Sequence, residues 1–165
     1  TRARFSAGSK VVGGFFDDVR SEVLSQKRDV DQLRHEILEM RRKVHAGHPN
    51  PTPDFDLKHD AGGMVDIEFI VQFLVLAFSN THPQLIGNLG NIALLRIAGE
   101  VGLIQVSMAQ EVADAYRLLR ARQHRLRLDG AEKTRVDLEL EPQLVQAREV
   151  VLALWQEIFL APSDA

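Results

Sequence analysis

The segment from Phe55 to Gln72 contains the residues best suited to chemistry in this sequence. It passes from a loop through two glycines into a nearly all-apolar stretch. Three polar residues interrupt that stretch: Asp66, Glu68 and Gln72. An ionised carboxylate among apolar neighbours needs a cationic or hydrogen-bonding partner. The pattern therefore predicts a functional edge on a helical core.

The two carboxylates, Asp66 and Glu68, have the chemistry of a metal-binding pair. On a helix, however, side chains two residues apart differ in direction by about 200°, so they leave on opposite sides. The two cannot share an ion if both are helical. Asp66 would lie in the first helical turn, where free N–H groups and the helix dipole favour a carboxylate. Glu68 shares a face with Gln72, and both a buried structural ion pair and a site-facing role stay open for it.

The pair Gly62 and Gly63, together with Lys58, has the character of an anion-binding corner. Glycines permit backbone conformations that are closed to other residues. N–H groups at a helix start can bind an anion, and Lys58 is close enough in sequence to reach the same place. Ordinary turn formation is the alternative explanation of a Gly-Gly pair.

A basic stretch later in the sequence contains Arg117, Arg120 and His124, and no acid occurs between Arg117 and Leu128. Cations are favoured near a helix C-terminus, so a solvated helix face would explain the stretch. The functional interpretation is contact with a phosphate or a carboxylate. Arg120 and His124 are four residues apart and would face one partner together. We therefore expect Glu68 to pair with Arg120 or His124.

Composition limits the class of protein. The chain has 165 residues, of which 45% are hydrophobic and 26% charged, enough for one globular core. Its formal net charge of -3 gives no overall attraction to nucleic acid or to an anionic membrane. No apolar run approaches the roughly 18 residues of a membrane span, and there is no cysteine. We expect a cytoplasmic protein that binds neither nucleic acid nor membrane and holds no metal of its own.

Apolar residues recur at helical spacing and predict an all-α bundle of about six helices. One example is the four-residue step of Val11, Phe15, Val19 and Val23. The expected helices cover residues 9–24, 29–46, 64–78, 91–100, 107–128 and 142–160. Asp29 suits an N-cap, Gly47 ends the second helix, and Pro142 suits a first turn. The short strand candidates are residues 2–6 and 135–140.

Residues 48–54 divide the chain. The three prolines of this loop remove backbone donors and push the residues before them out of helical conformation. We expect a helical hairpin at 9–47, the Pro-rich loop at 48–54 and the main bundle at 55–165, all within one helical domain at 9–165. The chain opens at Thr1 with neither an initiator Met nor a signal segment, which indicates a piece of a longer protein.

The sequence resembles the glutamine synthetase adenylyltransferase family, the bifunctional adenylyl-transferring and adenylyl-removing enzymes of bacterial nitrogen control. The resemblance rests first on Phe55-Asp-Leu-Lys58, Gly62-Gly63, Asp66-Ile-Glu68-Phe-Ile and Gln72. It extends to Glu39-Met-Arg41-x-Lys43, to residues 115–126, and to Arg2-Ala-Arg4 with Ala7-Gly8. Nearly the whole chain is covered. The match is closer to the carboxyl-terminal half of these enzymes, the half implied to adenylylate glutamine synthetase.

The resemblance implies a parent enzyme that transfers AMP from ATP to a tyrosine of glutamine synthetase and removes it again. Family members hold Mg²⁺ with carboxylates of a Gly-Ser…Asp-x-Asp motif on a small α/β nucleotidyltransferase domain. We interpret this chain as lacking that motif, so the fragment should be inactive alone. Residues 1–8 would be the remnant of the α/β nucleotidyltransferase domain, and the helical domain would pack behind it.

The implied partners are glutamine synthetase, the PII signal protein and the chain's own upstream nucleotidyltransferase domain. ATP and Mg²⁺ would serve the parent enzyme, with no cofactor tightly bound to this fragment. The residues implied to lie nearest the nucleotide are Lys58, Gly62, Gly63, Asp66, Glu68 and Gln72. The basic stretch adds Arg117, Arg120 and His124.

Two other functions stay open. A HEPN-like ribonuclease would use Arg117 and His124, whose spacing fits its Arg…His signature, but it leaves the Gly-Gly-x-x-Asp-x-Glu segment unexplained. A helical protein-interaction module would bind a partner such as glutamine synthetase or PII through an apolar groove or the Pro-rich loop, and it is compatible with the family resemblance.

Overall fold

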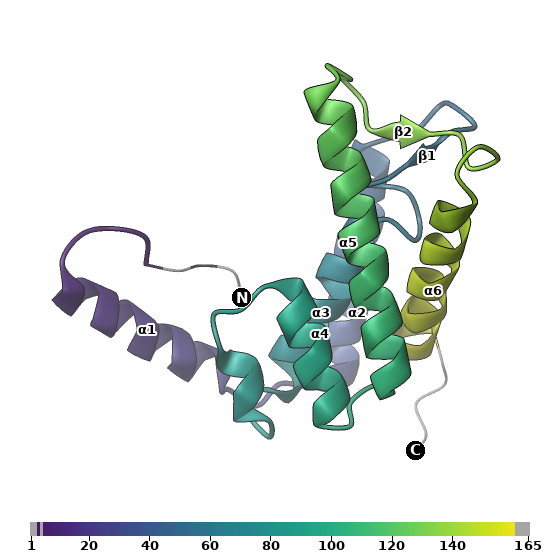
Figure 1. The fold of residues 1–165 in the computed structure, drawn as a ribbon. Coiled ribbons are helices and arrows are strands. Elements are labelled where there is room, and N and C mark those ends of the chain that lie inside the picture. The colour runs from purple at the N-terminus through teal and green to yellow at the C-terminus, as the bar shows by residue number, and fades with distance from the viewer. Residues whose placement is uncertain (1–2, 4, 161–165) are drawn as a thin grey trace.

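The computed structural model describes residues 3 and 5–160. Within them the chain forms six α-helices: α1 (Lys10–Leu24), α2 (Val30–Gly47), α3 (Met64–Phe78), α4 (Asn91–Glu100), α5 (Val106–Leu128) and α6 (Pro142–Phe159) (Figure 1). Three short elements connect them: strands β1 (Phe55–Asp56) and β2 (Arg135–Val136) and the 3₁₀ helix η1 (Pro83–Ile86). The predicted all-α bundle of about six helices is confirmed.

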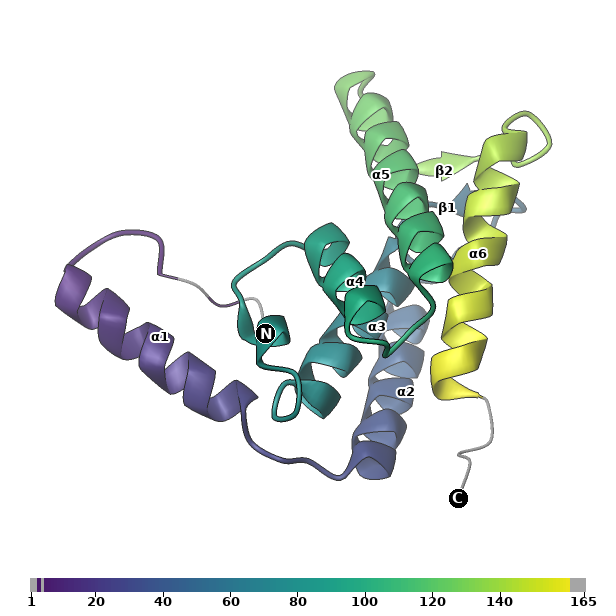
Figure 2. The same cartoon turned by 60° about the horizontal axis from the view of Figure 1, so that its bottom comes forward.

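Helix α3 lies at the centre of the bundle and contacts α2, α4, α5 and α6. This arrangement explains why its sequence is apolar on almost every side, because a helix surrounded by other helices has no solvent face. Ile67 and Ile70 are completely buried, and Phe73 is 2% exposed. The longest helix, α5, packs against α4 on one side and α6 on the other (Figure 2).

The first two helices do not form the predicted hairpin. Helix α2 packs along α3 as part of the bundle, whereas α1 projects away from it (Figures 1 and 2). Asp29 caps α2 as predicted, since its side chain accepts hydrogen bonds from the N–H groups of Asp31 and Gln32. Contacts between α1 and the bundle are near its end, where the Arg20 guanidinium donates to the Ile86 carbonyl at 2.6 Å and Leu24 is buried.

The strands β1 and β2 pair antiparallel, with Phe55 opposite Val136 and Asp56 opposite Arg135. The strand candidate at 135–140 is therefore confirmed only for its first two residues. Its partner β1 was not predicted, because two residues carry no alternation to detect. The other strand candidate, 2–6, includes residues outside the described part of the chain. The Pro-rich residues 48–54 form no helix.

Among the described helices, none combines the length and the apolar character that crossing a membrane requires.

Candidate functional site

The loop from β1 to α3 is held in one shape by its own carboxylates. Asp56 Oδ1 accepts hydrogen bonds from the N–H groups of Lys58 at 2.9 Å and His59 at 3.0 Å. Asp60 Oδ2 accepts from the Asp56 N–H at 2.8 Å and from Asn50 Nδ2 at 2.7 Å. Such side-chain to backbone bonds fix turns that have no ladder of their own. The loop therefore places Lys58 and the start of α3 precisely.

The two glycines serve this loop rather than an anion. Gly62 has φ +83°, and a Cβ there would lie 2.5 Å from Arg148 Cγ and 2.9 Å from its carbonyl oxygen. A Cβ on Gly63 would lie 2.9 Å from the Asp60 carbonyl oxygen. The N–H of Gly62 donates to Asp66 Oδ2 at 2.7 Å, and that of Gly63 donates to Asp60 O at 2.9 Å.

The next three amides are also engaged, so the predicted anion site at this helix start is wrong. The N–H groups of Met64, Val65 and Asp66 donate to the carbonyls of Leu57, Lys58 and Gly63, respectively. N–H groups that already have partners are not available to a ligand. Ordinary turn chemistry, the alternative interpretation, explains the Gly-Gly pair.

Asp66 is the buried, paired carboxylate of α3. Its side chain is 4% exposed and forms an ion pair with Arg41 of α2, whose side chain is 10% exposed. Arg41 also donates from Nη2 to the carbonyl of His59 at 2.8 Å. The predicted first-turn position of Asp66 is confirmed, but its cationic partner was missed. The pair ties α2, the loop and α3 together, which gives Asp66 a structural role.

The Glu68 side chain lies on the side of α3 opposite Asp66, as the about 200° between their directions predicts, and it is half-buried. Tyr116 of α5 donates its hydroxyl to Glu68 Oε1 at 3.2 Å. The expected partners were Arg120 and His124. Arg120 lies one turn after Tyr116, with its guanidinium 5.8 Å from the centre of that ring. Tyr116 precedes Arg120 by four residues and so shares its face of α5, but no spacing in the sequence links it to Glu68.

These side chains line one cavity of about 620 Å³ between α3, α5 and the loop before α4. Its lining includes Lys58, Glu68, Asn91, Tyr116, Arg120 and Gln123. Two cations, one carboxylate, a phenol and amides converge on it. Of the predicted residues, the structure brings Lys58, Glu68 and Arg120 together here.

The other predicted residues lie elsewhere. Arg117 and His124 line an adjacent cavity of about 430 Å³, which shares Arg120 and Gln123 with the first. Gln72 lines a separate cavity of about 20 Å³. Arg117 also forms an ion pair with Asp114, so part of the basic face is neutralised by an acid that precedes the stretch.

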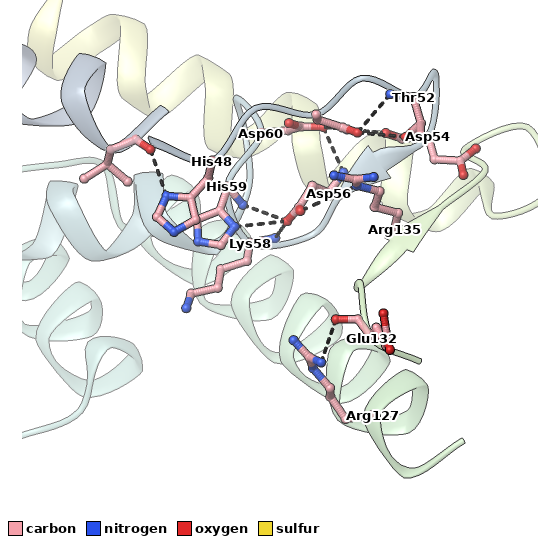
Figure 3. A network of polar contacts seen from close by, with 12 residues as sticks. His48, Thr52, Asp54, Asp56, Lys58, His59, Asp60, Arg127, Glu132 and Arg135 are labelled. Carbon is pink, nitrogen blue, oxygen red and sulfur yellow. Dashed lines mark hydrogen bonds and ion pairs between the residues drawn. The ribbon is translucent and has the colours of Figure 1, made fainter. Parts of the chain in front are cut away.

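A further cavity, of about 500 Å³, extends from Lys58 and Gln123 to the loop before β2. Figure 3 shows the polar network at its edge, where the rings of His48 and His59 stack at 4.0 Å with an 8° interplanar angle. Asp56 lies 3.5 Å from His59 Nδ1 and 3.9 Å from Arg135 Nε.

Burial lowers the pKa of His59 below its ordinary value; the nearby Asp56 raises it in part, while His48, Lys58 and Arg41 lower it further. This cavity shares Lys58 with the 620 Å³ cavity, so the polar network lies next to the candidate site.

The interpretation that no Asp-x-Asp motif occurs needs correction, since the letters appear at Asp29-Val-Asp31 and Asp54-Phe-Asp56. In the first pair, Asp29 caps α2 and Asp31 pairs with Arg34. In the second, Asp56 binds the amides of its own loop. Neither pair stands on an α/β unit. Among residues 3 and 5–160, no three acidic or histidine side chains are arranged to hold a metal ion.

Comparison with known proteins gives the family. A protein-family model described as GlnD PII-uridylyltransferase matches residues 31–150, from the start of α2 into α6. The chain belongs to this family. The matched region contains the whole candidate cavity, including its Lys58, Glu68 and Arg120 side chains.

Individual proteins similar to this chain are named bifunctional glutamine synthetase adenylyltransferase/adenylyl-removing enzymes. The chain is 52% identical to that of Bordetella bronchiseptica, 54% identical to that of Burkholderia pseudomallei and 56% identical to that of Ralstonia nicotianae. Each alignment covers 96% of this chain but only 16 or 17% of the relative. The chain thus spans about a sixth of their length. The resemblance to the adenylyltransferases is confirmed over nearly the whole chain.

Proposed function

We propose that this chain is the helical domain of a glutamine synthetase adenylyltransferase and that its 620 Å³ cavity faces the nucleotide during AMP transfer. The observation that carries the proposal is the identity of 52 to 56% with such enzymes across 96% of the chain. The parent enzyme would transfer AMP from ATP to a tyrosine of glutamine synthetase and remove it again.

The chemistry of the cavity supports a nucleotide neighbour. Lys58 and Arg120 offer cations for phosphate oxygens, and Arg120 adds the planar fork that suits them. Glu68, held by Tyr116, offers an acceptor for the hydroxyl or amino groups of a nucleoside. With one carboxylate, the same donor set does not fit Mg²⁺, which prefers several oxygen ligands. The metal would therefore bind to carboxylates elsewhere in the parent enzyme, and the fragment alone would be inactive.

The partners follow from the same proposal. Glutamine synthetase would be the substrate protein, PII would signal the nitrogen state, and the parent's own nucleotidyltransferase domain would supply the catalytic carboxylates. A cytoplasmic location suits all three. This proposal is compatible with the alternative of a protein-interaction module, in which the surface of the helical domain binds one of these proteins.

The test is AMP transfer from labelled ATP to glutamine synthetase, measured with the parent enzyme carrying Lys58→Met. A hydrogen bond to a charged group contributes about 1.5–3 kcal/mol, so we expect kcat/KM for ATP to fall roughly 10- to 150-fold. Lys27→Met is the matched control, because Lys27 is an exposed lysine in the linker between α1 and α2. It should leave kcat/KM unchanged.

Equal kcat/KM values for the two variants would contradict the proposal that the cavity faces the nucleotide. The 165-residue chain assayed alone should transfer no AMP. Transfer by the chain alone would show that its own residues hold the catalytic metal.

The description of the family model favours a second candidate, transfer of UMP to PII. The two candidates share the nucleotidyl-transfer chemistry and differ in nucleotide and target protein. An assay of the parent enzyme with labelled UTP and PII separates them, and we expect no UMP transfer.

A further inference from the structure

Helix α1 carries an apolar face that the bundle does not cover. Val11 is 81% exposed, Phe15 70%, Val19 41% and Val23 46%. They recur every four residues and form one stripe along the helix. Val12, 62% exposed, widens the stripe. No other helix in the described part of the chain presents as many large, exposed apolar side chains.

The opposite face of α1 makes the contacts within the chain. Gly13 lies under the ring of Phe5, where a Cβ would come within 3.0 Å of the ring atoms. Arg20 bonds to Ile86, and Leu24 is buried. At 100° per residue, this face points about 140° away from the stripe. The stripe therefore faces away from these contacts, on a helix that projects from the bundle (Figure 2).

We infer that the stripe of Val11, Phe15, Val19 and Val23 is a docking surface for the part of the same parent chain that lies outside these 165 residues. This inference rests on the proposed function. An exposed stripe of this size is unfavourable in water and is typical of an interaction surface. Relatives of this chain are about six times its length, since it covers 16% of them. Most of the surface able to cover α1 thus lies outside these 165 residues.

The charges beside the stripe argue against a second copy of the chain as occupant. Asp18 and Glu22 are exposed and border one edge of the stripe, three residues after Phe15 and Val19. In a two-fold antiparallel pair of α1 helices, the same edges meet, so the acidic edge of one helix would lie along the acidic edge of its copy. Like charges that meet across an interface destabilise the contact. The pattern fits an apolar surface bordered by Lys or Arg.

The experiment is hydrogen–deuterium exchange of the α1 amides, compared between the 165-residue chain and the parent enzyme. We expect exchange of residues 10–24 to be at least about tenfold slower in the parent, because docking suppresses local opening. Phe15→Asp in the parent should return the exchange rate to that of the 165-residue chain. Val19→Asp is a second variant with the same expectation.

Leu140→Asp is the matched control, since Leu140 is 79% exposed and precedes α6 on another part of the molecule. It should leave α1 exchange slow. Equal α1 exchange in chain and parent would overturn the inference. So would a dimer of the 165-residue chain that protects α1 and is lost in Phe15→Asp, because the occupant would then be a second copy.

The readout is independent of catalysis, so the two proposals fail separately. Fast exchange of the α1 amides in a parent enzyme that transfers AMP would refute only the proposed docking surface. A protected α1 in a parent enzyme that transfers no AMP to glutamine synthetase would sink only the proposed function.

Discussion

Two carboxylates only two residues apart on α3 have opposite roles because their surroundings differ. Asp66 is buried with Arg41 and accepts a hydrogen bond from Gly62 at 2.7 Å, so its charge is matched within the chain. Glu68 opens onto a 620 Å³ cavity and has Tyr116 as a neighbour. A buried ion pair need not add net stability, but removing one partner leaves the other charge uncompensated.

Replacing Asp66 with Asn should therefore destabilise the fold by about 3–5 kcal/mol, because Arg41 would stay buried without a counter-charge. Glu68→Gln is the control on the opposite side of the same helix and should cost about 1 kcal/mol or less. Urea unfolding followed by circular dichroism measures both. Similar losses for the two variants would contradict the structural role assigned to Asp66.

Protonation of the His59 ring makes the unfolding free energy depend on pH. Its pKa is lowered in the folded chain, chiefly by burial, so protonation favours the unfolded state. The contribution of His59 to stability is therefore complete above the ordinary histidine pKa of about 6.5 and is lost as pH falls through the lower folded-state pKa. We expect the unfolding free energy of the wild type to fall more steeply between about pH 7 and pH 5 than that of His59→Gln. Parallel pH profiles for the two proteins would refute this link.

At the scale of elements, the start of α3 depends on a glycine whose position leaves no room for a Cβ. Gly62 has a positive φ and contacts Arg148 of α6, which also donates from Nε to the Ala61 carbonyl at 3.0 Å. Gly102 has φ +80° but open space around it, so it offers a matched comparison.

Gly102→Ala should cost about 1–2 kcal/mol for the left-handed backbone alone. Gly62→Ala should cost about 1–3 kcal/mol more, because its Cβ would also collide with Arg148. Chemical denaturation of both variants gives the difference. Equal losses would mean that α6 yields to the added methyl group and that the close approach is not needed.

Local patterns predicted the helices well and their partners poorly. Helices α3 and α4 begin and end at the predicted residues. The stripe of α1 also has the predicted spacing, but periodicity shows that a face is apolar and not what covers it. Among the described residues, α1 meets the bundle near its end, at Arg20 and Leu24, and the expected hairpin did not form.

The candidate site shows the same limit. Lys58, Glu68 and Arg120 were singled out by residue type, and the structure brings them to one cavity. The ion pair of Asp66 with Arg41 spans 25 residues, and the bond from Tyr116 to Glu68 spans 48. No local spacing rule reaches that far. The amides at Gly62 and beyond were expected to be free, but the sequence does not show which carbonyls a loop will fold back to meet.

For the whole molecule, the described residues divide into a bundle around α3 and the projecting α1. The bundle places Lys58 from the loop before α3, Glu68 from α3 and Arg120 from α5 around one cavity. The packing of α5 between α4 and α6 fixes the last of these positions. Helix α1 adds no residue to the cavity lining, which suits a role in joining domains rather than in binding the nucleotide.

This division predicts opposite results for truncations of equal size. A chain that starts at Arg20 keeps Leu24 and loses, among described residues, a single buried one, Gly13. It should unfold cooperatively with a loss of about 1 kcal/mol or less, since few apolar contacts are removed. Removing residues 147–165 instead deletes Val151 and Leu154, both completely buried.

Each large buried side chain contributes about 2–5 kcal/mol, so that second chain should not fold. Circular dichroism and urea titration of both truncations distinguish the cases. A loss of several kcal/mol on removing residues 1–19 would mean that α1 belongs to the bundle core after all, and the exposed stripe could then not serve as a docking surface.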